Sequence, residues 1–124
     1  MISRVSTVGV YVRDQDKALE FYTDKLGFEV RKHVDEPDFK WFEVAPPGGE
    51  TTIVLCAPDY QTGDESKIGR YTEIAFHADD MRELHRVYTE RGVKFTQEPR
   101  LEPYGVWFAA FIDQDENEYF VFQP

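Results

Sequence analysis

The sequence contains one cysteine, Cys56, so no disulfide can form within the chain. It also lacks a long unbroken run of apolar residues, which excludes an ordinary membrane-spanning helix. The first residues, MISRVSTVGVYV, have polar residues inside their apolar stretch and no small-residue cleavage pattern, so we expect no signal peptide. These features predict a cytoplasmic setting and no contact with a membrane.

Positive charge is scarce as well. The chain of 124 residues has 14 Lys and Arg against 24 Asp and Glu, which gives a net charge of −10. Such a charge repels phosphate backbones and excludes nucleic acid as a partner. It favours a neutral or cationic ligand, although an acidic surface that serves only solubility has the same composition.

An internal repeat organises the sequence. Residues 41–58, WFEVAPPGGETTIVLCAP, align without a gap with residues 107–124, WFAAFIDQDENEYFVFQP, at an offset of 66 positions. This alignment makes Trp41 and Trp107 equivalent. It predicts two copies of one unit, residues 1–58 and 67–124, joined by the polar segment 59–67.

Each copy has the pattern of a βαβββ unit. In the first copy, Asp14 or Asp16 can cap a helix whose apolar residues have helical spacing and which ends at Gly27. In the second copy, Asp79 or Asp80 has the same place. The expected strands are residues 6–12, 28–33, 40–45 and 51–57 in the first copy and 72–78, 93–97, 106–112 and 118–123 in the second.

This pattern predicts an α+β fold. Each sheet is hydrophobic on both faces while its helix covers only one, so the other face must also be buried. We expect one domain, residues 1–124, in which two tandem βαβββ modules form curved sheets around a central cup, with the helices outside. Concave sites of this kind usually bind small molecules.

Three segments carry a resemblance to a known family: VYVRDQDKALEFYTDKLGFEV, IAFHADDMRELHRVYTERGVKF and EPYGVWFAAFIDQDENEYFVFQP. In their order and duplication the chain resembles the vicinal oxygen chelate superfamily, which includes glyoxalase I, extradiol dioxygenases, fosfomycin-modifying enzymes and bleomycin-resistance proteins. The resemblance implies paired βαβββ modules, a bound small molecule and a homodimer.

The resemblance also implies where a metal would bind. In the metal-dependent members, His, Gln or Glu from the first and last strands of the two modules hold a divalent ion. These positions fall on Thr7 and Glu73 in the first strands and on Val54 and Phe120 in the last strands. Only Glu73 is a good ligand, so we expect no metal and no cofactor.

Glu73 is the main candidate for chemistry. Strand alternation places Glu73 and His77 on one face, and a carboxylate near Phe120 and Val54 would be partly desolvated. Glu73 could then act as a general acid or base, or bind a cationic group of a ligand. The alternatives are a Glu paired with an Arg or exposed at the mouth of the cup, and a His77 that is solvated or associated with the helix cap.

Aromatic residues complete the predicted site. In bleomycin-binding relatives, aromatic rings in the region of Trp41, Tyr104 and Trp107 hold planar ligand groups, whereas packing alone would explain at least one of the two tryptophans. Tyr11 lies on the same face of the first strand as Thr7. The predicted ligand-binding residues are Thr7, Tyr11, Trp41, Val54, Glu73, His77, Tyr104, Trp107 and Phe120.

The favoured function is a metal-independent small-molecule-binding protein of the glyoxalase and bleomycin-resistance type. The alternative is a lyase or dioxygenase-like enzyme, with Glu73 as acid or base or with an atypical metal site. A third hypothesis is a structural or regulatory module whose cup is filled by its own side chains. A bound metal, or loss of turnover in Glu73→Gln with binding retained, would favour the enzyme.

Overall fold

The computed structural model describes residues 1–58 and 64–124. The chain forms two compact units, Met1–Ile68 and Gly69–Pro124. Most of the predicted linker, residues 59–63, lies outside the described residues. The module boundaries at 58 and 67 therefore stay predictions.

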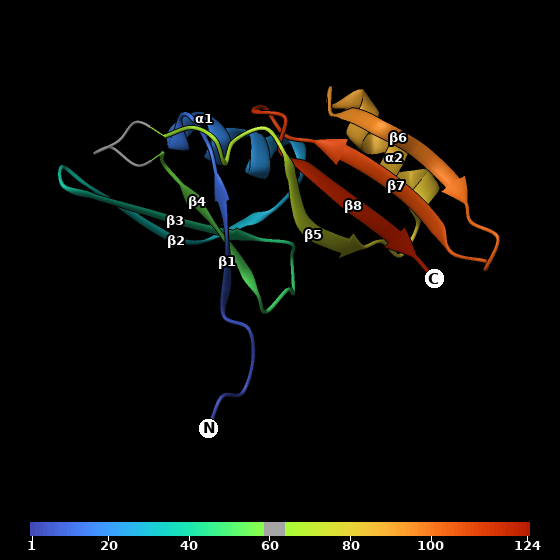
Figure 1. The fold of residues 1–124 in the computed structure, drawn as a ribbon, viewed down its shortest axis with the longest axis horizontal. Helices are drawn as coiled ribbons and strands as arrows, with labels where there is room; N and C mark the ends of the chain where they lie inside the picture. The colour runs from blue at the N-terminus through green and yellow to red at the C-terminus, as the bar shows by residue number, and fades with distance from the viewer. Residues whose placement is uncertain (59–63) are drawn as a thin grey trace. The chain divides into compact units, whose positions relative to one another are not determined.

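The first unit is a four-stranded sheet with one helical segment (Figure 1). Its elements are β1 (Thr7–Tyr11), α1 (Gln15–Glu20), the π-helical turn η1 (Phe21–Lys25), β2 (Glu29–Glu36), β3 (Phe39–Ala45) and β4 (Thr52–Cys56). The strand order is β1-β4-β3-β2, with β1 parallel to β4 and the other pairs antiparallel.

The second unit repeats this arrangement. Its elements are β5 (Tyr71–His77), α2 (Met81–Glu90), β6 (Lys94–Leu101), β7 (Trp107–Ile112) and β8 (Glu118–Gln123). The strand order β5-β8-β7-β6 has the same parallel and antiparallel pairs, and α2 lies against one face of the sheet (Figure 1). The α+β fold built from two tandem βαβββ modules is therefore confirmed.

Both helices begin at an aspartate cap. The carboxylate of Asp14 accepts a hydrogen bond of 3.1 Å from the backbone N–H of Lys17, and that of Asp80 accepts one of 3.1 Å from Glu83. These bonds satisfy backbone donors that the first turn of a helix leaves without a partner. Of the two candidates in each copy, Asp14 and Asp80 are thus the caps.

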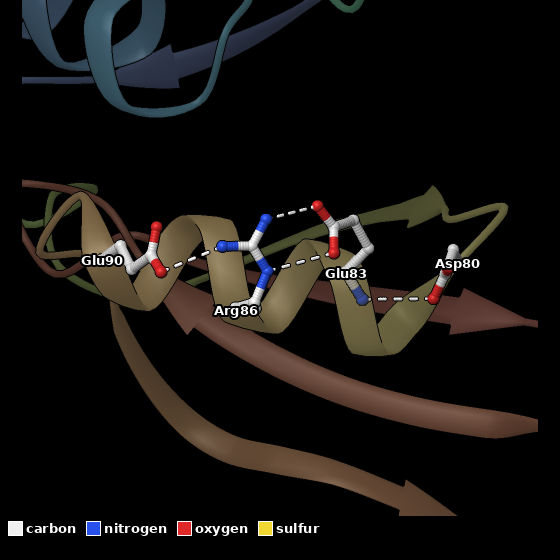
Figure 2. A network of polar contacts seen from close by, with 4 residues as sticks. All are labelled: Asp80, Glu83, Arg86 and Glu90. Atoms are coloured by element: carbon white, nitrogen blue, oxygen red, sulfur yellow. Dashed lines mark hydrogen bonds and ion pairs between the residues drawn. The ribbon is translucent and has the colours of Figure 1, made fainter.

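The exposed face of α2 carries a chain of charged contacts (Figure 2). The guanidinium of Arg86 donates to Glu83 at 2.6 Å and to Glu90 at 2.9 Å, three and four residues away along the helix. The hydrogen bond from Arg86 lowers the pKa of the Glu83 carboxyl. These contacts stabilise the helix locally, as charged pairs at this spacing do.

Each unit has its own apolar core. Phe42, Val44 and Leu55 are fully buried in the first. In the second, the ring of Tyr88 on α2 meets Phe111 on β7 edge-on, with ring centroids 5.6 Å apart, and burial raises the pKa of Tyr88 to about 12. Alternation along the strands thus separates a helix-covered face from an opposite face.

The registers of the two sheets correct the sequence alignment at one strand. Glu43 on β3 lies opposite Val54, and Ala110 on β7 lies opposite Phe120. Gly9 on β1 pairs with Val54 on β4, and Ala75 on β5 pairs with Phe120 on β8. The offset of 66 therefore holds between β1 and β5 at this point and between β4 and β8. The offset of β3 to β7 is one residue larger.

The tryptophans are consequently not equivalent. The counterpart of Trp41 is Phe108, and Trp107 lies on the opposite face of β7, across from Gln123. The gapless alignment was wrong here because the connection between β3 and β4 is one residue longer than the connection between β7 and β8.

A bulge alters the first strand of the second unit. Tyr71 pairs with Glu118 and Ala75 with Phe120, so the single intervening residue of β8, Tyr119, lies opposite three residues of β5, 72–74. Glu73 lies within this stretch at a φ of 64°. The counterpart of Thr7 in the register is therefore Tyr71, not Glu73.

Within residues 1–58 and 64–124, no helix has both the length and the apolar composition needed to cross a membrane.

Candidate functional site

A pocket of about 590 Å³ opens at one end of the first unit's sheet. At this end β1 and β4 finish, β3 begins, and the hairpin between β2 and β3 turns. The lining residues are Tyr11, Gln15, Pro37, Asp38, Phe39, Lys40, Trp41, Val54, Leu55, Cys56, Ala57 and Pro58. The volume is within the range of about 300–1,000 Å³ that is usual for small-molecule sites.

Three aromatic residues, Tyr11, Phe39 and Trp41, line the pocket. Phe39 and Trp41 point to the same side of β3, and their rings lie nearly parallel, at an angle of 14° with centroids 6.1 Å apart. On the neighbouring part of the sheet, the ammonium of Lys67 lies 5.0 Å from the ring centroid of Tyr11. Such rings can stack on a planar ligand without demanding particular polar groups from it.

Lys40 carries the positive charge of the pocket lining, and it forms ion pairs with two carboxylates of the protein. Its Nζ lies 3.1 Å from Asp16 at the start of α1 and 3.8 Å from Asp35 on β2. The hydrogen bond to Asp16 raises the pKa of Lys40. Asp38, also in the lining, forms no salt bridge with any residue that the structure describes. The polar rim is therefore negative on balance.

A buried carboxylate lies beside the pocket. Glu43 on β3 is 5% exposed, and its two oxygens accept hydrogen bonds from Trp41 Nε1 at 2.5 Å and Thr52 Oγ1 at 2.6 Å. Lys32 Nζ lies 3.9 Å away. Burial by itself disfavours the carboxylate, but the bonds from Thr52 and Trp41 and the charge of Lys32 outweigh it, so the pKa of Glu43 is lowered.

Cys56 contributes a thiol to the lining. Its Sγ donates to the carbonyl oxygen of Val54 at 3.6 Å. Burial raises the pKa of the Cys56 thiol. The group is thus a protonated, weakly polar part of the wall near neutral pH and not an activated nucleophile.

The pocket brings together part of the predicted site. Tyr11, Trp41 and Val54 all line it. Thr7 does not, because it begins β1 while Tyr11 ends the same strand, and its side chain is exposed. The ligand-binding roles of Tyr11, Trp41 and Val54 stay predictions.

The predicted residues of the second unit lie on separate elements. Glu73 is exposed in the bulge of β5. His77 ends that strand, also exposed, with Nε2 3.2 Å from Oδ1 of Asp79. Both arrangements are the plain structural alternatives that the sequence left open, and the functional roles of these two residues stay predictions.

The predicted aromatic residues of the second unit differ in their surroundings. Tyr104 is 70% exposed in the turn after β6, whereas Trp107 is half-buried at the start of β7. Phe120 stacks on Tyr71 with centroids 4.2 Å apart and meets Phe108 edge-on at 5.0 Å. Tyr71 and Phe108 are therefore aromatic neighbours of Phe120 that the sequence analysis did not name.

Several residues that line the pocket, and Glu43 beside it, escaped the sequence analysis. Gln15, Asp38, Phe39, Lys40 and Glu43 were not singled out. A signal for Glu43 was present, since the alternation in KWFEVA puts Trp41 and Glu43 on one face of a strand and Phe42 and Val44 on the other. The hairpin residues gave no signal, because a turn of this composition is common on protein surfaces.

The residues at the superfamily's metal positions do not fit a divalent ion. Val54 and Phe120 have no donor atom, and Thr7 offers only a hydroxyl. In the part of the chain that the structure describes, no group of three or more His, Cys, Asp or Glu side chains converges as a metal site would require. These residues therefore do not form a site for a divalent metal.

Comparison with known proteins agrees with the fold. The family model of the glyoxalase/bleomycin resistance protein/dioxygenase superfamily matches residues 4–119. The chain belongs to this superfamily.

Three relatives show how far the similarity extends. The uncharacterized protein YetH of Bacillus subtilis (strain 168) is 36% identical, over 94% of this chain and 95% of its own. A superfamily member from Sphaerobacter thermophilus DSM 20745 is 36% identical in sequence, and its crystal structure matches this one with a TM-score of 0.90 over 99% of this chain and 98% of its own. TnmS3, an antibiotic binding protein from Streptomyces sp. CB03234, is 32% identical with a TM-score of 0.82, covering 99% and 97%.

Proposed function

We propose that this superfamily member binds an organic small molecule without a metal, in the pocket lined by Tyr11, Phe39 and Trp41. The observation that carries the proposal is a pocket of about 590 Å³ at one end of the first unit's sheet, with three aromatic rings in its lining. The cup predicted between the two modules stays a prediction, and the experiment below distinguishes it from this pocket.

The charge around the pocket supports a neutral or cationic ligand. Lys40 is neutralised by Asp16 and Asp35, and Asp38 adds a further carboxylate at the rim. An anionic ligand would have to approach these carboxylates and a chain of net charge −10. Like-charge contacts of this kind reduce both the rate and the strength of binding.

The similarity to TnmS3 supports binding rather than turnover. That protein is an antibiotic binding protein, and its chain aligns with this one over nearly the whole length of both. Binding and catalysis both occur on one fold, so this support adds to the pocket and does not replace it.

The test uses one aromatic ring with three charges: 1-naphthylmethylamine, 1-naphthalenemethanol and 1-naphthoate. We expect calorimetric titration to show binding of the amine and the alcohol and much weaker binding of the carboxylate. Dialysis against EDTA should leave these titrations unchanged. Absence of binding by all three, or tight stoichiometric binding of nickel, zinc, manganese or iron, would contradict the proposal.

Matched substitutions locate the site. Trp41→Leu removes an aromatic ring from the pocket wall. We expect this substitution to weaken the binding of the amine and of the alcohol by about 3- to 10-fold, the usual contribution of a ring contact. Trp107→Leu makes the same change in the second unit. If Trp107→Leu weakens the binding of these ligands and Trp41→Leu does not, the result would favour the predicted cup over the pocket.

One observation keeps the enzymatic alternative, a lyase or dioxygenase-like reaction with Glu73 as acid or base. Glu73 has a φ of 64°, and strained residues gather at functional sites. This alternative predicts that Glu73→Gln retains the ligand and abolishes its conversion, which product analysis by mass spectrometry would detect.

We propose in addition that the chain is a cytoplasmic homodimer. The edge strands of the two sheets, β1 and β2 in the first and β5 and β6 in the second, offer backbone groups for association. Light scattering after size exclusion should give twice the mass of 14.5 kDa, and a single-chain mass would contradict the proposal.

A further inference from the structure

A hydrogen bond orients the Trp41 ring although the residue is not buried. Trp41 is 36% exposed and forms part of the pocket wall. A side chain with this exposure ordinarily samples several rotamers, and a ligand that stacks on it must first immobilise it. Here the indole Nε1 donates to Glu43 Oε2 at 2.5 Å, which holds one orientation of the ring.

Glu43 is itself held from two neighbouring strands. Its second oxygen accepts the hydroxyl of Thr52 on β4 at 2.6 Å, and the ammonium of Lys32 on β2 lies 3.9 Å from the oxygen that receives Trp41. With 5% exposure, the carboxylate has little access to water as an alternative partner. The support of the ring therefore extends across β2, β3 and β4.

Stability alone does not account for a carboxylate at this position. Glu43 lies between the fully buried Phe42 and Val44 and opposite Val54. Replacing a buried charge and its partners by apolar side chains of similar volume is often neutral or stabilising. A carboxylate at such a place thus points to a need for its acceptor oxygens, and one of those oxygens is used by a residue of the pocket wall.

We infer that Glu43 is a positioning residue of the ligand pocket, which presets the plane of the Trp41 ring for stacking against a planar ligand. The inference rests on the proposed function and adds a residue that acts through Trp41, since Glu43 does not itself line the pocket. The lowered pKa of Glu43 keeps the acceptor ionised near neutral pH.

The experiment compares two substitutions of Glu43 in a Trp107→Phe background, where Trp41 is the remaining tryptophan. Glu43→Leu removes both acceptor oxygens. Glu43→Gln keeps one oxygen for Trp41 and can donate its amide N–H to Thr52, so it should restore most of the arrangement. The measurements are the time-resolved fluorescence anisotropy of Trp41 without ligand and calorimetric titration with 1-naphthalenemethanol.

We expect Glu43→Leu to increase the nanosecond motion of the Trp41 ring. It should also weaken the binding of 1-naphthalenemethanol by about 3- to 10-fold, the usual effect when the ligand itself must immobilise one side chain. Glu43→Gln should stay within about twofold of the background. Thr52→Val, which loosens Glu43 without altering Trp41, should change both measurements in the same direction as Glu43→Leu and decides the question if Glu43→Leu does not fold.

Unchanged anisotropy and affinity in a folded Glu43→Leu or Thr52→Val protein would overturn the inference. Failure of the proposed function has a different signature. If the background protein binds neither the alcohol nor the amine, the proposed function fails, while the anisotropy of the ligand-free variants still decides whether Glu43 fixes the ring.

Discussion

Trp41 and Glu43 are two residues apart on β3, and the indole N–H of one donates to the carboxylate of the other at 2.5 Å. The bond joins a residue of the pocket wall to a buried charge. The shape of the pocket should therefore depend on a group that titrates.

Acid should weaken the folded state through Glu43. Because the pKa of Glu43 in the folded protein is lowered from the usual 4.5, the carboxylate stabilises the fold above that pH and loses its contribution as the pH falls through the folded pKa. Urea unfolding should show wild type more stable than Glu43→Gln near neutral pH, with a gap that narrows below pH 4.5. Glu116→Gln, an exposed change in a turn, should show no such trend, and an equal gap for Glu43→Gln at every pH would contradict the prediction.

Asp113 should be the most sensitive residue of the turn before β8. Its carboxylate accepts from the backbone N–H groups of Asp115 and Asn117 and from Asn117 Nδ2, at 2.8, 3.0 and 2.9 Å. The other side of the Asn117 amide accepts from Gly69, so the amide cannot flip to suit a new partner. Asp113→Asn sets two N–H₂ groups against each other and should cost about 1–3 kcal/mol.

Thermal and urea unfolding measure this loss. Glu116→Gln makes the same change of charge in the same turn but at an exposed residue, and it should cost less than about 0.5 kcal/mol. Equal losses for the two variants would mean that the bonds of Asp113 do not stabilise the turn.

The fold could be predicted from the sequence because its signals are local and occur twice. Strand alternation, the aspartate caps and the stops at Gly27 and Gly92 specify each βαβββ unit without reference to the other. Both of these glycines have positive φ, as residues that end a helix commonly do. Two copies with one order of elements left few other folds to consider.

The site was only partly predictable, because it depends on register. One extra residue between β3 and β4 moves Trp107 to the opposite face from the counterpart of Trp41, and no residue type in the turn signals the shift. Likewise, the bulge that contains Glu73 is a backbone irregularity with no glycine to mark it.

The bulge gives a prediction for Glu73. A non-glycine residue with a φ of 64° is strained, whereas glycine adopts this conformation readily. Glu73→Gly should leave the free energy of unfolding unchanged or raise it by up to about 1 kcal/mol. Glu98→Gly, the same change at an exposed residue of β6, should lower it by about 0.5–1 kcal/mol. A loss at Glu73 as large as that at Glu98 would show that its side chain stabilises the bulge.

Cys56 reports whether a ligand occupies the pocket. Because burial raises the pKa of its thiol, alkylation by iodoacetamide near neutral pH should be slower than that of free cysteine and should still accelerate above pH 9. Cys56 lines the pocket, so saturating 1-naphthalenemethanol should slow the reaction further. Mass spectrometry follows the modification, and Cys56→Ser is the unlabelled control. Alkylation as fast as that of free cysteine would mean that the thiol is not shielded, and a rate that bound naphthalene alcohol leaves unchanged would place the ligand away from β4.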